Sequence, residues 1–191
     1  AFERDSRWLG RAQRQTLLPR LLYKRTPYRE QDSLPLFDTA ERDFNSVSIF
    51  APDVYSGLDR IADAHQVTFG ASSRWVDATT GAETLRLGLA QRYRFATQRV
   101  TLAGGTEPLD RRFSDLLLDG STAQWTHWRF DAALQYDPDQ ERIARSLLAA
   151  RYSPGPYRTA SVGYRLARDR SEQLEFGWQW PLWRGTARPL G

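Results

Sequence analysis

Glu83–Phe95 reads ETLRLGLAQRYRF, and large apolar side chains occupy every second position over most of its length. The positions between them carry small or basic residues, so Arg86, Arg92 and Arg94 share the opposite face of an extended chain. A helix would instead scatter these three arginines around its circumference. The stretch therefore predicts a β-strand with one apolar face and one basic face.

The same period of two recurs along the chain in segments of about 10 residues, which is the length that a tilted strand needs to cross a bilayer. The predicted strands are Gln15–Tyr28, Gln66–Val76, Thr84–Phe95, about Phe113–Gln124, Trp128–Tyr136, Ile143–Tyr152, Ala160–Ala167 and Gln173–Leu182, and residues 1–5 resemble the end of another strand. Short polar or Pro/Gly breaks predict tight turns at Ala78–Gly81, Asp137–Glu141, Ser153–Pro156 and Arg168–Ser171. The pattern predicts an all-β, antiparallel up-and-down meander.

The composition favours a membrane barrel over a soluble sheet. Mean hydropathy is -0.62, yet aromatic residues make up 13% of the chain. Both values suit a barrel, in which one face of each strand meets lipid, the other lines a wet lumen, and aromatic girdles mark the two interfaces. The residues expected in such belts are Tyr93, Phe95, Trp125, Trp128, Tyr136, Tyr152, Tyr164, Trp178, Trp180 and Trp183. We expect a partial, unclosed slice of a large transmembrane outer-membrane β-barrel.

Two connections are expected to be long, at about residues 29–64 and 97–112. A compact soluble domain seldom keeps a connection of about 30 residues without regular structure. Bacterial outer-membrane barrels do so, because they pair short periplasmic turns with longer extracellular loops.

The first long connection contains YSGLDRI at Tyr55–Ile61, followed by GASSR at Gly70–Arg74. This run resembles a signature of the LptD family of lipopolysaccharide-assembly proteins. Further segments are similar to that family in the same order, namely Phe2–Asp5, Leu18–Arg20, Pro27–Arg29, Gln91–Tyr93, Gln135–Asp137, Tyr164-Arg165 and Trp180-Pro181. The resemblance covers nearly the whole chain and identifies residues 1–191 as a single segment from the central to C-terminal part of the barrel. We expect the family's N-terminal jellyroll and closing strands to lie outside it.

The resemblance implies a function without covalent chemistry or a cofactor. The family's barrel receives lipopolysaccharide from a periplasmic bridge protein, LptA, through the N-terminal domain and delivers it to the outer leaflet of the Gram-negative outer membrane. A plug lipoprotein, LptE, occupies the lumen, and outer-membrane lipids surround the barrel. An isolated slice would leave strand edges unpaired, so we expect it not to fold as a stable monomer.

Two sets of residues are candidates for the functional site. The signature loop consists of Tyr55, Ser56, Gly57, Leu58, Asp59, Arg60 and Ile61, which either act in passing substrate or hold the fold of their own loop over the lumen. We favour the structural role, because Gly57 suggests a demanding backbone position and Asp/Arg pairs commonly satisfy turns. The lumen-facing set consists of Arg74, Arg86, Arg92, Arg94, Arg145, Arg151 and Arg165. These arginines either form a path for the phosphates of the substrate or contact the plug and solvate the wall.

Other function classes find less support in the residues. A porin-like diffusion channel would share the lipid-facing pattern but has no reason to carry the Tyr55–Ile61 run. A soluble, arginine-rich sheet binding nucleic acid would need an internal core to bury the leucine and tryptophan rows. His65 and His127 are the only histidines and lack metal-ligand spacing, and no nucleophile and base arrangement is evident, so neither a metal site nor an enzyme is expected.

Overall fold

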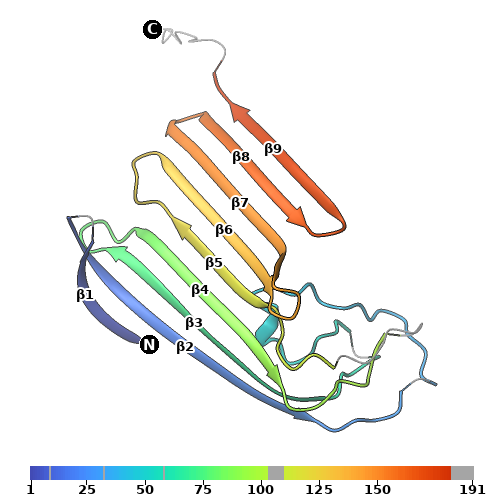
Figure 1. Cartoon of the computed structure of the whole chain (residues 1–191). Coiled ribbons are helices and arrows are strands. Elements are labelled where there is room, and N and C mark those ends of the chain that lie inside the picture. Colours follow the sequence, from blue (N-terminus) through green and yellow to red (C-terminus); the bar gives the residue numbers. More distant parts are fainter. Residues whose placement is uncertain (9, 32, 58, 103–109, 182–191) are drawn as a thin grey trace, which may run out of the picture.

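The computed structural model of the protein describes residues 1–8, 10–31, 33–57, 59–102 and 110–181. Within these residues, nine strands follow one another (Figure 1). They are β1 (Phe2–Trp8), β2 (Arg11–Thr26), β3 (Ala64–Asp77), β4 (Glu83–Arg94), β5 (Leu116–Thr122), β6 (Trp128–Asp137), β7 (Arg142–Gly155), β8 (Arg158–Ala167) and β9 (Ser171–Gln179). A 3-10 turn, η1 (Ser48–Phe50), lies between β2 and β3. None of the helical segments described is long and apolar enough to cross a membrane.

The strands form one sheet in the order β1 to β9, and each strand pairs antiparallel with the next. Only neighbours in the sequence are neighbours in the sheet, so the predicted all-β, unclosed meander is confirmed. The described parts of the β2–β3 and β4–β5 connections lie at one end of the sheet, which we call the long-connection end (Figure 1). The turns β1–β2, β3–β4 and β7–β8 lie at the opposite, short-turn end.

Several strand boundaries differ from the predicted ones; β2, for example, begins at Arg11 and not at Gln15. The hairpin expected at Ser153–Pro156 is present but begins later, because β7 continues to Gly155 and the chain reverses at Pro156 and Tyr157. β6 pairs with β7 only as far as Tyr152, so Pro154 lies where its missing N–H breaks no ladder with β6. The strand expected at Phe113–Gln124 is shorter, because β5 spans only Leu116–Thr122 and Phe113 forms an isolated bridge with Tyr93.

The register separates two chemically different faces. All of the predicted lumen-facing arginines lie on one face of the sheet, which we call the arginine face. The strand register places them there: Arg74 pairs with Arg86, and Arg145 pairs with Gln135. The opposite face, which we call the apolar face, carries large hydrophobic side chains that remain exposed to the surroundings. These include Leu17, Leu21, Tyr23, Phe69, Leu87, Leu89, Leu118, Phe130, Leu148, Val162, Leu174, Phe176 and Trp178. A soluble sheet would bury such a surface.

Aromatic rings lie at both ends of the apolar face. At the long-connection end Tyr23, His65, Phe95, Tyr93 and Phe113 form a chain of ring contacts. At the short-turn end lie Trp8, Trp75, Trp125, Trp128, Trp178 and Trp180, which are all of the tryptophans that the structure describes. Trp183, predicted to join a belt, falls outside the described residues.

The spacing of the two belts fits a membrane. His65 and Trp75 lie 10 residues apart on β3. At roughly 3.3 Å per residue and a tilt of about 40°, that separation is roughly 25 Å along the barrel axis, close to the apolar band of about 25 Å in outer-membrane barrels.

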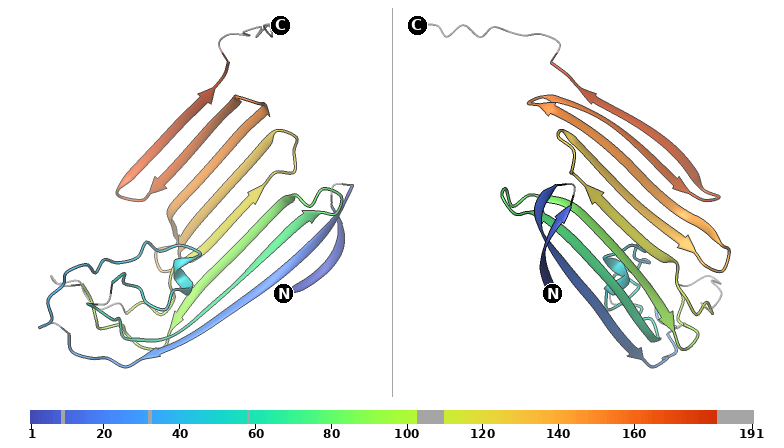
Figure 2. Two further views of the ribbon diagram at one scale, coloured as in Figure 1. Left: turned by 180° about the vertical axis from the view of Figure 1, so that it is seen from behind. Right: turned by 60° about the vertical axis from the view of Figure 1, so that its left-hand side comes forward.

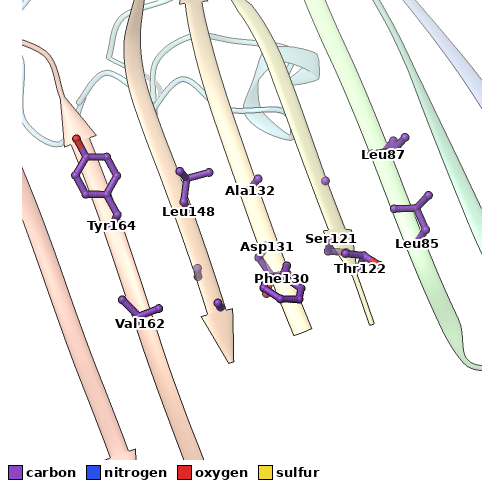
Figure 3. A pocket seen from close by; sticks show the side chains of 13 residues that line it. Leu85, Leu87, Ser121, Thr122, Phe130, Asp131, Ala132, Leu148, Val162 and Tyr164 are labelled. Carbon is purple, nitrogen blue, oxygen red and sulfur yellow. The ribbon is translucent and has the colours of Figure 1, made fainter. Parts of the chain in front are cut away.

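A shallow hollow of about 420 Å³ lies on the apolar face between β4 and β8 (Figure 3). Gly120 and Ala132 contribute almost no side chain there, whereas Leu85, Phe130 and Leu148 stand around them. The hollow is therefore a gap in a row of large side chains and has an almost wholly apolar lining.

The two faces predict opposite responses to charge at adjacent positions of β7. In the full-length protein in lipid, Leu148→Arg should lower the free energy of unfolding by about 2–4 kcal/mol, because it places a guanidinium in hydrocarbon near the middle of the strand. Ala149→Arg should cost less than about 1 kcal/mol, because its register partner on the arginine face is Asp131. Urea unfolding in lipid vesicles measures both, and equal costs would contradict the assignment of the faces.

Candidate functional site

The arginine face is divided into covered and open parts. Two of the predicted arginines on β4 are buried, Arg92 with 2% of its surface exposed and Arg94 with 8%. The Nη2 atom of Arg92 donates to the backbone oxygen of Ile49 over 2.6 Å, and its Nε atom donates to Thr68 Oγ1 over 3.2 Å. Arg94 Nη1 donates to the backbone oxygen of Arg111 over 3.3 Å. Both guanidinium groups therefore hold connections against the sheet.

Three more arginines of this face have carboxylate partners. Arg74 Nε lies 2.6 Å from one oxygen of Glu83, and Arg86 Nε lies 3.9 Å from the other. Arg145 Nη1 lies 2.8 Å from Asp43 Oδ1 in the β2–β3 connection. These three side chains are exposed, so solvent screens their ion pairs.

Arg151 on β7 and Arg165 on β8 are the open part of the set. Both are exposed, and neither side chain makes a hydrogen bond or an ion pair with any part of the chain that the structure describes. Their donors are therefore available to an anion. Among the seven arginines predicted to form the substrate path, these are the two whose guanidinium groups have no hydrogen-bonding or ion-pair partner within the described residues.

The β2–β3 connection folds back onto the arginine face near β4 and β5 (Figure 2). Ile49 is fully buried there against Ala90 and Leu117, with Phe44 and Phe50 packed around them. Arg20 on β2 lies over the ring of Phe50 at 4.0 Å, a cation–π contact. The connection itself thus covers the part of the arginine face formed by β4 and β5.

Small residues on the strands make room for this contact. A Cβ atom added at Gly70 would lie 2.9 Å from the ring of Phe50 and 2.7 Å from the backbone oxygen of Leu89. Sequence reasoning missed the docking of residues 43–50. The available signal was an apolar group, Phe44, Ile49 and Phe50, within a connection that is otherwise polar.

The signature loop is bound to the segment just before it. Asp59 Oδ2 accepts the backbone N–H groups of Phe37 and Asp38 over 2.9 and 3.0 Å. Hydrogen bonds from the backbone N–H groups of Asp38 and Phe37 lower the pKa of Asp59 below its ordinary 3.8. A hydrogen bond with Asp59 and the repulsion of its charge raise the pKa of Asp38.

The other residues of the signature loop also contact neighbouring backbone. The backbone N–H and hydroxyl of Ser56 both donate to the backbone oxygen of Ala40, and Ile61 exchanges hydrogen bonds with the side chain of Gln31. Gly57 has a φ of +78°, and a Cβ there would lie 2.7 Å from Asp38 Oδ1. Arg60 is buried. Leu58 lies outside the described residues.

The signature loop is also joined to the second long connection. Tyr55 is buried with Ala62 and Val100, and its hydroxyl donates to the backbone oxygen of Val100 over 2.9 Å. Burial raises the pKa of the Tyr55 hydroxyl. Asp63 accepts the backbone N–H groups of Arg99 and Val100. The two connections therefore form one packed unit at the long-connection end.

Arg111 forms a second junction that sequence reasoning missed. Its guanidinium lies 3.1 Å from Asp115, 2.6 Å from Asp137 and 2.6 Å from Asp139. These contacts tie the β4–β5 connection to the β6–β7 turn. The acidic residues of that turn are visible in the sequence, but nothing there indicates which arginine reaches them. No cluster suited to a metal ion occurs among the residues described.

The sequence was compared with families of known proteins. The family model described as "LPS transport system D" matches residues 1–184. The chain belongs to the LptD family. Members of this family are transport proteins of the Gram-negative outer membrane, not enzymes. Membership decides against the porin-like and nucleic-acid-binding alternatives.

Curated LptD proteins match the chain over nearly its full length. The LPS-assembly protein LptD of Polaromonas sp. is 48% identical over 194 residues, which cover 100% of this chain and 23% of that protein. The corresponding proteins of Acidovorax sp. and Burkholderia lata are 48% and 40% identical, over 95% and 96% of the chain. The chain spans about a quarter of the length of these relatives, 23% and 24% for the latter two.

Gly57 and Gly81 form a matched pair for testing the signature loop of this LptD segment. Both have a positive φ, +78° and +71°, but a Cβ at Gly81 meets nothing within 4 Å. Gly81→Ala should therefore cost only the backbone penalty of about 1–2 kcal/mol. Gly57→Ala adds a clash with Asp38, so it should cost more and lower the yield of folded barrel. The folded fraction by gel mobility before and after heating measures both, and equal yields would contradict the crowding at Gly57.

The carboxyl pair in the signature loop predicts a pH response. Because folding lowers the pKa of Asp59, its contribution to loop stability is present above pH 3.8 and is lost as the pH falls through the lowered value. Asp38 has the opposite sign, since its raised pKa disfavours the ionised form in the folded loop. We expect acid-protease cleavage within residues 31–63 to increase only below pH 3.8. In the Asp59→Asn variant, the increase in cleavage below pH 3.8 should be absent. An increase in cleavage that begins above pH 3.8 would contradict the direction of the pKa shift of Asp59.

Proposed function

We propose that this LptD segment forms part of the wall of an outer-membrane barrel that delivers lipopolysaccharide to the outer leaflet. The observation that carries the proposal is the pair of open guanidinium groups, Arg151 and Arg165, on the face opposite the exposed apolar rows. A guanidinium binds phosphate oxygens through two parallel hydrogen bonds. A phosphorylated glycolipid passing along the lumen would find these donors available.

Within the predicted substrate path we assign different roles to the arginines. Arg151 and Arg165 contact the phosphates of the substrate. Arg74, Arg86 and Arg145 exchange their carboxylate partners for phosphate as it passes, because exposed ion pairs are weak. Arg92 and Arg94 hold the connections in place and do not contact substrate.

We assign positions to the partner proteins from the same distinction between open and covered parts of the arginine face. The plug lipoprotein LptE lies against the arginine face, where exposed guanidinium groups and the folded β2–β3 connection offer polar contacts. The bridge protein LptA supplies lipopolysaccharide through a domain outside these 191 residues. The signature loop Tyr55–Ile61 serves the fold of the long-connection end, since its described side chains bind neighbouring backbone.

The test replaces the two open arginines in the full-length protein, as Arg151→Gln with Arg165→Gln. Loss of charge-assisted hydrogen bonds of about 1.5–3 kcal/mol each should slow delivery of lipopolysaccharide to acceptor vesicles about tenfold or more. Arg170→Gln is the matched control, because Arg170 is also exposed but lies in the β8–β9 turn. Folded barrel yield should not change in either variant. Unchanged delivery by the double variant would contradict the proposed path.

A further inference from the structure

A basic hollow opens at the long-connection end of the sheet, separate from the open arginines of the arginine face. Its volume is about 530 Å³, and Arg25, His65 and Arg99 are among its lining residues. Arg25 and His65 are register partners on β2 and β3. The alternation of side chains places both on the same face as Tyr23, which is the apolar face.

The guanidinium groups of Arg25 and Arg99 have N–H donors that can bind a ligand in this hollow. Arg25 is exposed, and its side chain makes no hydrogen bond or ion pair within the described chain. Arg99 lies over the ring of Tyr28 at 5.5 Å. A cation–π contact uses the flat side of the guanidinium and leaves the N–H groups at its edge free to bind an oxygen.

The nearby carboxylates already have partners. Asp63 lines the hollow, but it is buried and accepts the backbone N–H groups of Arg99 and Val100 over distances of 2.7 to 3.1 Å. Glu30 accepts the hydroxyl of Tyr28, and Asp110 accepts the hydroxyl of Thr97. None of these carboxylates makes an ion pair with Arg25 or Arg99 in the described part of the chain, so the N–H donors of both guanidinium groups are available to an anion.

The depth of Arg25 in the membrane suits a lipid phosphate. Arg25 lies two residues beyond Tyr23, whose ring belongs to the aromatic chain at this interface. Aromatic belts mark the edge of the hydrocarbon, and head groups lie just outside it. Toward the membrane centre the same face of β2 presents Tyr23 and then Leu21, which are 57% and 75% exposed. The phosphate site therefore continues into a surface that acyl chains can cover.

We propose that Arg25 and Arg99, together with His65, bind the phosphate of a lipid in the leaflet around the long-connection end, on the outside of the barrel. The orientation of the barrel in the outer membrane, on which the proposed function also rests, makes this a phosphorylated lipid of the outer leaflet. The site holds a resident lipid against the wall and lies apart from the transport path. It anchors the long-connection end at a fixed depth in the membrane.

The test measures lipid binding by the purified full-length protein in detergent micelles, using native mass spectrometry. The probes are bis-phosphorylated lipid A, its dephosphorylated form and inorganic phosphate. Arg25→Gln with Arg99→Gln should weaken binding of the phosphorylated lipid about tenfold. Arg158→Gln is the control, because Arg158 lies over Trp180 at 5.7 Å at the short-turn end and should leave that binding unchanged. Arg25→Gln alone should give a smaller loss, and it is expected to fold normally because Arg25 has no partner to lose.

The outcomes separate this site from the proposed transport path. Equal binding of the phosphorylated lipid by the wild type and the double variant would overturn the site. Equal retention of the dephosphorylated lipid, or full displacement by inorganic phosphate at matched concentration, would overturn its assignment to a lipid phosphate. The Arg25 and Arg99 variants should still deliver lipopolysaccharide at the wild-type rate. Failure of the Arg151 and Arg165 test would leave this binding result unaffected.

Discussion

The backbone of this sheet must satisfy its own hydrogen bonds, because hydrocarbon offers N–H and C=O groups no other partner. Antiparallel pairing of β1 to β9 meets that need between the strands, and it fixes the register that places side chains on two faces. Every further property depends on this register. A slip of one residue would turn Leu148 toward the lumen and Arg151 toward the acyl chains.

The second level of organisation is the use of the arginine face as a docking surface for the chain itself. Arg92 and Arg20 hold the β2–β3 connection through a backbone oxygen and an aromatic ring. Ile49 of this connection is fully buried against the sheet. The signature loop then joins that connection to the next one through Tyr55 and Asp63. The guanidinium groups of Arg20 and Arg92 are thus structural. Arg145 on β7 pairs with Asp43 of the same connection, whereas Arg151 and Arg165 remain open.

Sequence reasoning predicted the strands and the two faces, because a period of two is a local property that survives without knowledge of contacts. The family came instead from the resemblance of Tyr55–Ile61 and the segments around it. It missed the end of β7, since Ser153–Gly155 contains turn residues that are tolerated where β6 no longer pairs. It also missed the contact of Arg92 with Ile49 and the junction at Arg111. Such contacts join residues far apart in the sequence, and no local pattern encodes them.

The central claim is that one face of this sheet meets lipid and the other meets water. This segment contains no cysteine, so once any cysteines outside it are replaced, single cysteines at positions 146–151 of β7 can carry a nitroxide label in the full-length protein in lipid bilayers. Collision rates with oxygen and with a water-soluble nickel chelate then report the surroundings of each label. The account predicts oxygen-dominated rates at 146, 148 and 150 and chelate-dominated rates at 147, 149 and 151. Rates that vary smoothly along the strand, without a period of two, would contradict it.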